Sequence, residues 1–409
     1  MSPTSPLLNF LLRPEIFHKV FVVYFWGRSG SYFLTSLLDN HPDLLSVAPD
    51  ALQEFFPRML ATINGTHSDH PDMLAIEISK AFPKLFPVAR HEQSFVASKS
   101  RYGACKNETV GIDREKFVKF LALSLRSLAT RGVALSFQAI FGAVHAAHAH
   151  AMERNYSNST PAILWNLHLN HAQHDKVVRN NLPGTRFITM VRLPEKTLDS
   201  HFKHHLLETP FENLSTLPTR LISMLGEGDR AETDAIALRF EDLHRETEMT
   251  MRALAEWMEI PWSPQLMEST FEGKTWWWNG TMTGTDPTVA DSRETPYLNW
   301  MDRWKIRYAF AKNYKAWGYE PVYCPIEPMG CLVFEFFLLF PTKIGGLALA
   351  KDWHNAKGLL SKWVAIRAYL VEHWATRRVL KTIRQDRDRG KELLSLIRPK
   401  SKDREVAGF

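Results

Sequence analysis

The stretch FVVYFWGRSGSYFLTSLLDNHP, residues 21–42, constrains the fold more than any other part of the sequence. Residues 20–26 are apolar, with several β-branched and aromatic side chains, and this pattern predicts a buried parallel strand that ends at Gly27. Apolar residues then recur at helical spacing from Phe33 until Pro42, which predicts a short helix. A buried strand, a Gly/Ser turn and a helix in this order indicate an α/β fold whose first turn can bind an anion.

The alternation of strands and helices continues along the chain. We expect further strands at residues 186–191 and 235–240, and helices at residues 114–154, 194–207 and 244–258. Strands that alternate with helices predict a mostly parallel sheet covered by helices on both faces, which is a P-loop NTPase-like three-layer α/β fold. Phosphate-bearing ligands of such sheets bind beyond the carboxyl ends of the strands.

The Gly/Ser turn offers several backbone N–H groups close to a helix N-terminus. Gly27, Ser29, Gly30 and Ser31 surround Arg28, whose guanidinium adds a positive charge and a forked donor for two oxygens. No lysine follows the second glycine, as the nucleotide pattern GxxxxGK[ST] requires, and no acidic strand end is dedicated to magnesium. The turn therefore predicts a site for a phosphate-like group whose chemistry needs no metal. The alternative is that Arg28 is a surface arginine paired with a carboxylate.

Several segments resemble those of a known family. GRSGSYFLTSLLDNHPDL resembles the 5′-phosphosulfate loop of sulfotransferases that use 3′-phosphoadenosine 5′-phosphosulfate (PAPS), and is similar in style to the carbohydrate, tyrosylprotein and bacterial branches. RFITMVRLPEKTLDSHFKH resembles the 3′-phosphate-binding segment, a strand that ends in Arg-x-Pro with a serine eight residues after the arginine. LRFEDLHRETEMTMRALAEWMEIPW, FEGKTWWWNGT and KAWGYE are similar to later segments, and the set follows the family's order over residues 20–319.

The resemblance implies an enzyme that transfers a sulfuryl group in line from PAPS, a reaction in which positioning and electrostatics carry most of the catalysis. Arg28 would neutralise charge on the leaving phosphate, next to backbone amides of the turn that hold the 5′-phosphate. Arg192 and Ser200 would hold the 3′-phosphate, Lys274 would close over it, and a nearby tryptophan would stack on adenine. The implied donor-binding residues are Gly27, Arg28, Ser29, Gly30, Ser31, Tyr32, Phe33, Arg192, Ser200, Gly273, Lys274 and Trp276.

Some of these residues also have simpler interpretations. Tyr32 stands where the family carries a small hydroxyl residue, so it bonds the phosphate, faces the acceptor or only packs. Lys274 is otherwise a solvated lysine, and the tryptophans at 276–278 are otherwise core residues, because an indole buries a large area. Arg192 and Ser200 are otherwise an ordinary pair at the start of a helix.

The acceptor alcohol needs a base. The resemblance implies a carboxylate about nine residues beyond the His of the His-Pro pair, which here is Asp50, with Glu54 as the reserve. Asp50 is alternatively the N-cap of a helix that follows it. Histidines near the family-like segments are further candidates: His41, His168, His204 and His205.

Three more histidines form a cluster that invites a metal interpretation. His145, His148 and His150 lie at i, i+3 and i+5, so they do not share one helical face, and no carboxylate or cysteine is paired with them. We therefore predict no metal site.

The C-terminal part of the chain differs from the rest in charge. Residues 351–409 contain 15 Lys/Arg and 7 Asp/Glu, a net charge of +8, so the other 350 residues carry about −2 of the total of +6. A nucleic-acid-binding body is not indicated, whereas a basic tail that binds an acidic surface is. We divide the chain into a sulfotransferase domain, residues 1–323, and a basic amphipathic helical extension, residues 324–409.

Apolar residues recur at helical spacing inside this extension, among and before several lysines and arginines: Leu359, Leu360, Trp363, Ile366, Leu370 and Trp374. The pattern fits a helix that lies in the plane of a membrane surface. It fits equally a helix that packs on the body or on a second subunit of an oligomer. The apolar run at residues 330–340 is too short to cross a bilayer, which takes about 20 residues.

The sequence also leads to expectations about where the protein is located and which acceptor it modifies. Three scattered cysteines and an N-terminus without a signal-peptide pattern favour a cytoplasmic protein, peripheral at the inner membrane face where the basic tail binds it. The acceptor is a hydroxyl or amine of a carbohydrate, lipid or small metabolite. The rival hypotheses are a P-loop kinase and a non-catalytic protein that binds nucleotides or lipids.

Overall fold

The computed structural model describes residues 19–25, 28–65, 70–87, 100–154, 156, 161–168, 172–208, 216–227, 234–278, 283–291, 294–320, 329–388 and 393–397. Its strands are β1 (Val20–Phe25), β2 (Leu44–Ser46), β3 (Arg101–Tyr102), β4 (Ala162–His168), β5 (Arg186–Val191), β6 (Ala235–Arg239), β7 (Thr270–Phe271), β8 (Lys274–Trp277) and β9 (Ser395–Leu396). The helices that precede β6 are α2 (Ser31–Leu38), α3 (Phe55–Gly65), α4 (Pro71–Ala81), α7 (Arg114–Thr130), α8 (Phe137–Ala151), α9 (Ala172–Asn181), α10 (Pro194–Lys203) and α11 (Leu217–Glu227). Those that follow it are α12 (Phe240–Arg245), α13 (Thr247–Met258), α14 (Pro287–Asp291), α15 (Trp300–Ala309), α16 (Ala311–Ala316), α17 (Met329–Phe337), α18 (Lys343–Asn355) and α19 (Leu359–Asp388).

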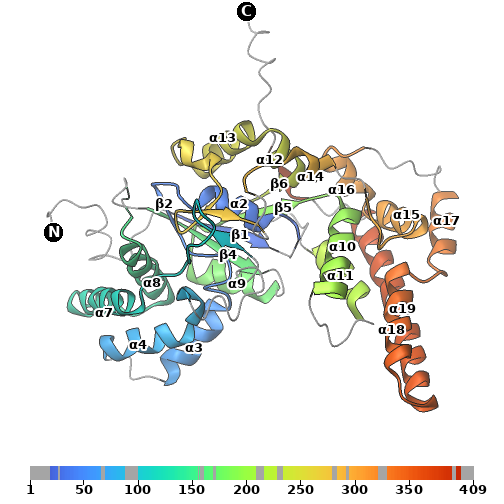
Figure 1. The fold of residues 1–409 in the computed structure, drawn as a ribbon, viewed down its shortest axis with the longest axis horizontal. Coiled ribbons are helices and arrows are strands. Elements are labelled where there is room, and N and C mark those ends of the chain that lie inside the picture. The colour runs from blue at the N-terminus through green and yellow to red at the C-terminus, as the bar shows by residue number, and fades with distance from the viewer. Residues whose placement is uncertain are drawn as a thin grey trace, which may run out of the picture.

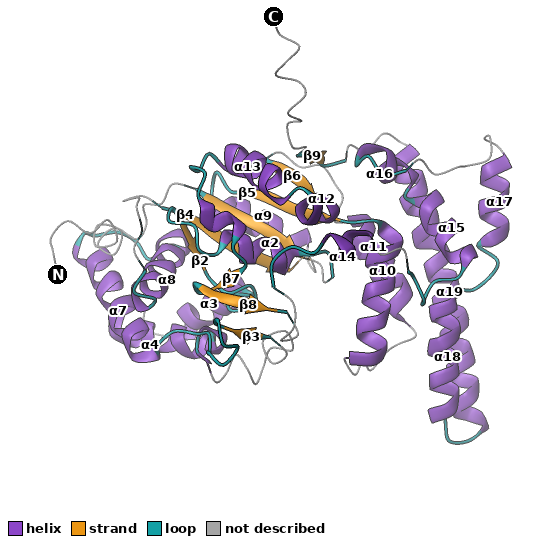
Figure 2. Ribbon diagram, turned by 45° about the horizontal axis from the view of Figure 1, so that its top comes forward, coloured by secondary structure: helices purple, strands orange, loops and turns teal. Residues whose placement is uncertain are grey.

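Six strands form a parallel sheet in the order β2-β4-β1-β5-β6-β9, of which Figure 1 labels the first five and Figure 2 also labels β9. The strands expected at residues 20–26, 186–191 and 235–240 are confirmed as β1, β5 and β6. The sequence does not predict β2, β4 or β9, because two of them are very short and the third, AILWNLH, carries polar residues within its apolar run.

Each face of the sheet is covered by helices. Val20 and Val22 of β1 point into a core shared with α3, α4, α7, α8 and α9. Phe21 and Val23 point into a second core shared with α2, α12 and α13. Because successive side chains of a strand alternate between the two faces of its sheet, both sets are buried only if helices cover both sides. The three-layer α/β fold expected from the sequence is confirmed.

Two of the expected helices are each divided in the structure. The helical region expected at residues 114–154 consists of α7 and α8, separated by a turn in which Gly132 adopts a φ of +68°. The helix expected at residues 244–258 begins earlier, as α12, and is interrupted at Glu246 before α13. The helix expected at residues 194–207 is α10, followed by a π-helical segment at His204–Glu208.

A small antiparallel sheet, β3-β8-β7, lies beside α2 and is tied to it by a buried aspartate. Asp39 follows α2 and is 1% exposed. Its carboxylate accepts hydrogen bonds from Ser46 Oγ at 2.8 Å, Thr270 Oγ1 at 3.1 Å and Gly273 N at 2.9 Å. A carboxylate with several such donors fixes the β7–β8 turn against the C-terminal end of the helix that begins in the Gly/Ser turn.

The C-terminal region is helical, and it returns to the sheet at its end. Helices α10, α11, α15, α16, α17, α18 and α19 contribute to a third core with Val191 and Ala237. β9 pairs with β6, so residues near 395 extend the central sheet. Figure 2 shows α18 and α19 side by side, extending away from the sheet. None of the helices in the described part of the chain combines the length and apolar character that a bilayer-spanning segment needs.

Candidate functional site

The turn between β1 and α2 is built to expose backbone amides. Arg28 and Gly30 have positive φ values of 65° and 93°, and α2 begins at Ser31 without a side-chain cap from the described residues. The first hydrogen bond of the helix runs from Leu34 N to Gly30 O. The amides of the first three helical residues, 31–33, therefore have no acceptor within the helix, and such a helix N-terminus favours an anion. Gly27, the first residue of the predicted turn, lies outside the described residues.

Gly30 is required by the close approach of another element. A Cβ atom at this position would lie 2.3 Å from Cδ2 of Phe240, the first residue of α12. The positive φ at residue 30 is also a conformation that side chains with a Cβ rarely adopt. The glycine thus lets the end of β6 approach the turn that follows β1.

Ser29 carries an unsatisfied polar group inside the turn. The residue is 0% exposed, and its hydroxyl has no hydrogen-bond partner among the described residues. A buried hydroxyl without a partner costs about 1–3 kcal/mol, which an oxygen of a bound anion would offset. The Ser29 hydroxyl therefore leaves a hydrogen-bond donor available to a bound anion.

The structure brings the two predicted phosphate sites together. Arg28 Nε donates to Ser200 Oγ over 3.1 Å, which joins the turn after β1 to the helix after β5. The Arg28 guanidinium also lies 5.5 Å from the ring of Trp278. Since β1 and β5 pair in parallel, their carboxyl ends lie at the same edge of the sheet, and this contact follows from that pairing.

Arg192 is the second cation at this edge. Its guanidinium lies 4.4 Å above the ring of Phe240, and its buried Nε has no hydrogen-bond partner in the described part of the chain. Burial lowers the pKa of Arg192, and the positive charge of Arg28 lowers it further, whereas Glu241 opposes the shift. Two guanidiniums that repel each other favour an anion between them.

Lys196 is a third cation that the sequence analysis missed. It lies one helical turn before Ser200 on α10 and is 9% exposed. Burial lowers the pKa of its amino group, and Arg192 contributes in the same direction. Its i, i+4 spacing from Ser200 was the available signal, because this spacing places both side chains on one helical face.

Two histidines near these cations, the half-buried His205 and the buried His244, have a lowered pKa and are neutral at physiological pH. Burial lowers the pKa of His205 to about 4, assisted by the charges of His204, Arg220 and Arg28. Burial also lowers the pKa of His244 to about 4, assisted by Arg192.

The ring of Phe33 stacks on His244 at 4.5 Å, so this residue of the predicted loop uses its side chain for packing. Tyr32 packs as well, because its ring meets Phe271 edge-on at 6.5 Å, and the residue lies against the second core. The bulky side chain of Tyr32 thus packs away, and the backbone N–H of this residue stays in the first turn of α2.

The two predicted carboxylate bases have different surroundings. Asp50 is 7% exposed, with the amino group of Lys84 3.9 Å from its carboxylate. Helix α3 begins at Phe55, so Asp50 does not cap it. Glu54 is exposed and forms an ion pair of 3.2 Å with Arg58. None of the contacts of Asp50 and Glu54 within the described residues joins them to Arg28.

The other histidines considered from the sequence have structural partners. His41 Nε2 lies 2.8 Å from the carbonyl oxygen of Pro261, and burial lowers its pKa. The side chain of His168 lies outside the described residues. His145 is buried with a pKa of about 3, and His148 Nε2 lies 3.7 Å from Glu272 Oε1. Within the described ranges, no group of three metal-ligating side chains is brought together.

Residues 271–278, which resemble a later segment of the family, are positioned by the hairpin of β7 and β8. Gly273 adopts a φ of +74° in the turn between β7 and β8, and its amide donates to Asp39. Lys274 Nζ donates to the carbonyl of Thr109 over 2.7 Å, and Trp276 is 4% exposed with its indole N–H bonded to Ser100. The structure thus joins these three residues to the small sheet.

Trp278, two residues further along, lies beside Arg28, and it is one of the three tryptophans, with Trp276 and Trp277, that the sequence offers for stacking on adenine. No pattern within TWWWN distinguishes it from its neighbours.

A comparison with protein families gives one match. The model of the sulfotransferase family matches residues 20–264, which is more than half of the 409 residues. No curated protein matches the chain.

Three solved structures are similar to parts of the chain. The sulfotransferase domain of the Synechococcus PCC 7002 olefin synthase is 15% identical, with a TM-score of 0.39, over 72% of this chain and 95% of that one. The sulfotransferase domain from the curacin biosynthetic pathway is 14% identical, with a TM-score of 0.37, over 75% and 99%. A sulfotransferase from Mycobacterium avium is 14% identical, with a TM-score of 0.36, over 76% and 80%. On the match of the family model, which covers the glycine turn and the Arg192 segment alike, this chain belongs to the sulfotransferase family.

Proposed function

We propose that the protein transfers a sulfuryl group from PAPS to a hydroxyl or amine of a carbohydrate, lipid or small-molecule acceptor. The observation that carries the proposal is the contact between Arg28 and Ser200, which unites two anion-binding segments from different strands. A donor with two separate phosphate positions needs such a pair of segments. The family match favours this reaction over the phosphoryl transfer of a P-loop kinase.

The residues divide between the two ends of the donor. The amides at the start of α2, with the unpartnered Ser29 hydroxyl, would hold the 5′-phosphate. Arg192, Lys196 and Ser200 would hold the 3′-phosphate. Because Ser200 Oγ accepts its hydrogen bond from Arg28, its own proton remains to be donated. PAPS, when bound, supplies the reactive sulfuryl group.

Arg28 has the catalytic role in this proposal. Arg28 is part of the turn and its guanidinium donates to Ser200, so it would stabilise the negative charge that develops on the leaving phosphate. Donors that are already oriented stabilise such charge at little reorganisation cost. Ser200 therefore acts on Arg28 as a positioning residue as well as a ligand.

Asp50 remains the proposed base for the acceptor, and His205 is the alternative. His205 is neutral, so its ring can accept a proton, and a bound anionic donor would offset the charge of Arg28 that lowers its pKa. Glu54 is the weaker candidate, because it is exposed and paired with Arg58. The proposal includes no metal requirement and a cytoplasmic location.

Isothermal titration calorimetry with 3′-phosphoadenosine 5′-phosphate (PAP) and with ATP tests the nucleotide specificity. We expect PAP to bind with a Kd of about 1–10 μM and ATP with magnesium to bind at least ~30-fold more weakly, about 2 kcal/mol. Tight binding of ATP in the absence of PAP binding would contradict the proposal.

A further inference from the structure

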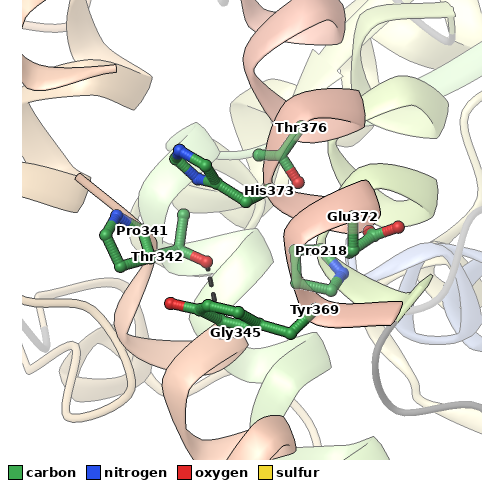
Figure 3. Close-up of a pocket in the computed structure, with 8 residues that line it drawn as sticks. All are labelled: Pro218, Pro341, Thr342, Gly345, Tyr369, Glu372, His373 and Thr376. Atoms are coloured by element: carbon green, nitrogen blue, oxygen red, sulfur yellow. Dashed lines mark hydrogen bonds between the residues drawn. The ribbon is translucent and has the colours of Figure 1, made fainter. Parts of the chain in front are cut away.

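Between residues 369 and 376, helix α19 faces the protein mainly with polar side chains. Figure 3 shows Tyr369, Glu372, His373 and Thr376 of this helix directed towards Pro218 and the 341–345 segment. Glu372 accepts a hydrogen bond of 2.9 Å from Thr219 N, and Thr376 Oγ1 lies 2.8 Å from Thr219 Oγ1. Glu372 and Thr376 are buried, so hydrogen bonds dock this part of the helix, and Leu380 and Ile383 further along it pack in the third core.

The opposite side of the helix is apolar and exposed. The largest exposed fractions are those of the first two residues, Leu359 and Leu360, at 82% and 81%. Further side chains that are at least half or nearly half exposed follow along the same side: Trp363, Val364, Leu370, Val371 and Trp374. A helix of a monomeric protein normally buries this stripe, so the exposed face calls for an external apolar partner.

The charges that accompany this face have one sign. Residues 356–385 contain seven lysines and arginines and one acidic residue, Glu372, which is buried. Arg377 and Lys381 are paired with Glu335 of α17. Arg367 and Arg378 are exposed among and beyond the apolar residues. The partner must therefore be apolar and negatively charged.

We propose that the outer face of α19 lies in the headgroup region of an anionic lipid bilayer, parallel to its surface. Tryptophans that flank an apolar stripe, with cations beside them, fit this interface. Trp353 of α18 adds to it, because Lys362 Nζ lies 4.9 Å from its ring and holds it beside the start of α19.

A second copy of the chain is the poorer partner. A two-fold symmetric dimer would set this face against itself, which brings Arg367 and Arg378 towards identical cations with no exposed carboxylate between them. This inference is independent of the sulfuryl transfer reaction. If it holds, a lipid or lipid-linked acceptor is favoured over a soluble one.

Vesicle sedimentation with the full-length protein tests the inference. We expect binding to vesicles of three parts phosphatidylcholine and one part phosphatidylserine, and at least ~10-fold weaker binding to phosphatidylcholine alone. Each cation near an anionic surface contributes about fivefold in affinity, so Arg367→Gln with Arg378→Gln should weaken binding about 25-fold. Trp363→Ser with Trp374→Ser should weaken it at least ~10-fold.

The matched control is Met73→Ser with Ile76→Ser on α4, two exposed apolar residues away from this helix, which should leave binding unchanged. Circular dichroism melting tests whether each pair of exposed substitutions folds as the wild type does. Recovery of the wild type in the supernatant with both kinds of vesicle would overturn the inference. So would a dimer in light scattering that the tryptophan pair converts to a monomer.

Discussion

Replacement of Arg28 by alanine is expected to lower the rate of sulfuryl transfer at saturating PAPS by about 100- to 1,000-fold, or ~3–4 kcal/mol. The guanidinium donates to Ser200 and lies next to the amides of the turn, so its loss removes the charge that stabilises the leaving phosphate. The measurement is the initial rate of PAP release in the presence of an acceptor fraction. We expect the Kd for PAP to rise much less than the rate falls, because the effect belongs to the transition state.

Two further variants separate charge from geometry at this position. Arg28→Lys keeps the charge but loses the forked donor geometry of the guanidinium. We expect its rate to be about tenfold higher than that of Arg28→Ala. Ser200→Ala removes the acceptor of the Arg28 Nε bond and should lower the rate less than Arg28→Ala does. An Arg28→Ala enzyme with an unchanged rate and a large rise in Kd would show that the guanidinium only binds the donor.

Arg192→Gln is expected to have the complementary effect. We predict that the Kd for PAP rises by about 100-fold while the rate at saturating PAPS changes by less than about threefold. The guanidinium is buried above Phe240 with an unpartnered Nε, so it would contribute charge-assisted hydrogen bonds to a phosphate that takes no part in bond breaking. Hydrogen bonds to charged groups contribute about 1.5–3 kcal/mol each, which sets this magnitude.

Arg186→Gln is the matched control for Arg192. Arg186 begins the same strand, β5, and its guanidinium lies 3.9 Å from the ring of Trp257, but it is at the opposite end of the strand. It also pairs with the exposed Glu259 at 3.0 Å. We expect the Kd for PAP to be unchanged in this variant. Equal losses of affinity in both variants would assign the effect to the stability of β5 and contradict a phosphate site at Arg192.

The fold could be predicted where the local pattern was strong. The apolar run of β1, the turn and α2 form one continuous signal. β5 and β6 are likewise short apolar runs that are followed by a helical pattern. β9 could not be predicted, because its two residues become a strand only through pairing with β6 across more than 150 residues of sequence. Long-range pairing of this kind leaves no local pattern.

The candidate site was predictable as parts but not as an arrangement. Arg28 and Ser200 were each predicted from their own segments, and the parallel register of β1 and β5 brings them to 3.1 Å. Lys274 and Trp276 illustrate the limit, because their positions depend on the β7–β8 hairpin and its anchor at Asp39. The sequence shows that α19 is amphipathic, whereas the structure, through the hydrogen bonds of Glu372 and the exposure of Trp363 and Trp374, shows that its apolar side faces outward.

Transfer of labelled sulfur tests the central claim most directly. The purified protein is incubated with sulfur-labelled PAPS and an extract of the host cell, next to a parallel reaction with ATP labelled in its γ-phosphate. We expect labelled products that require the added wild-type protein and that fall at least ~100-fold with Arg28→Ala. Label transferred from ATP and not from PAPS, or products that form equally with the Arg28→Ala protein, would contradict a sulfotransferase site at this turn.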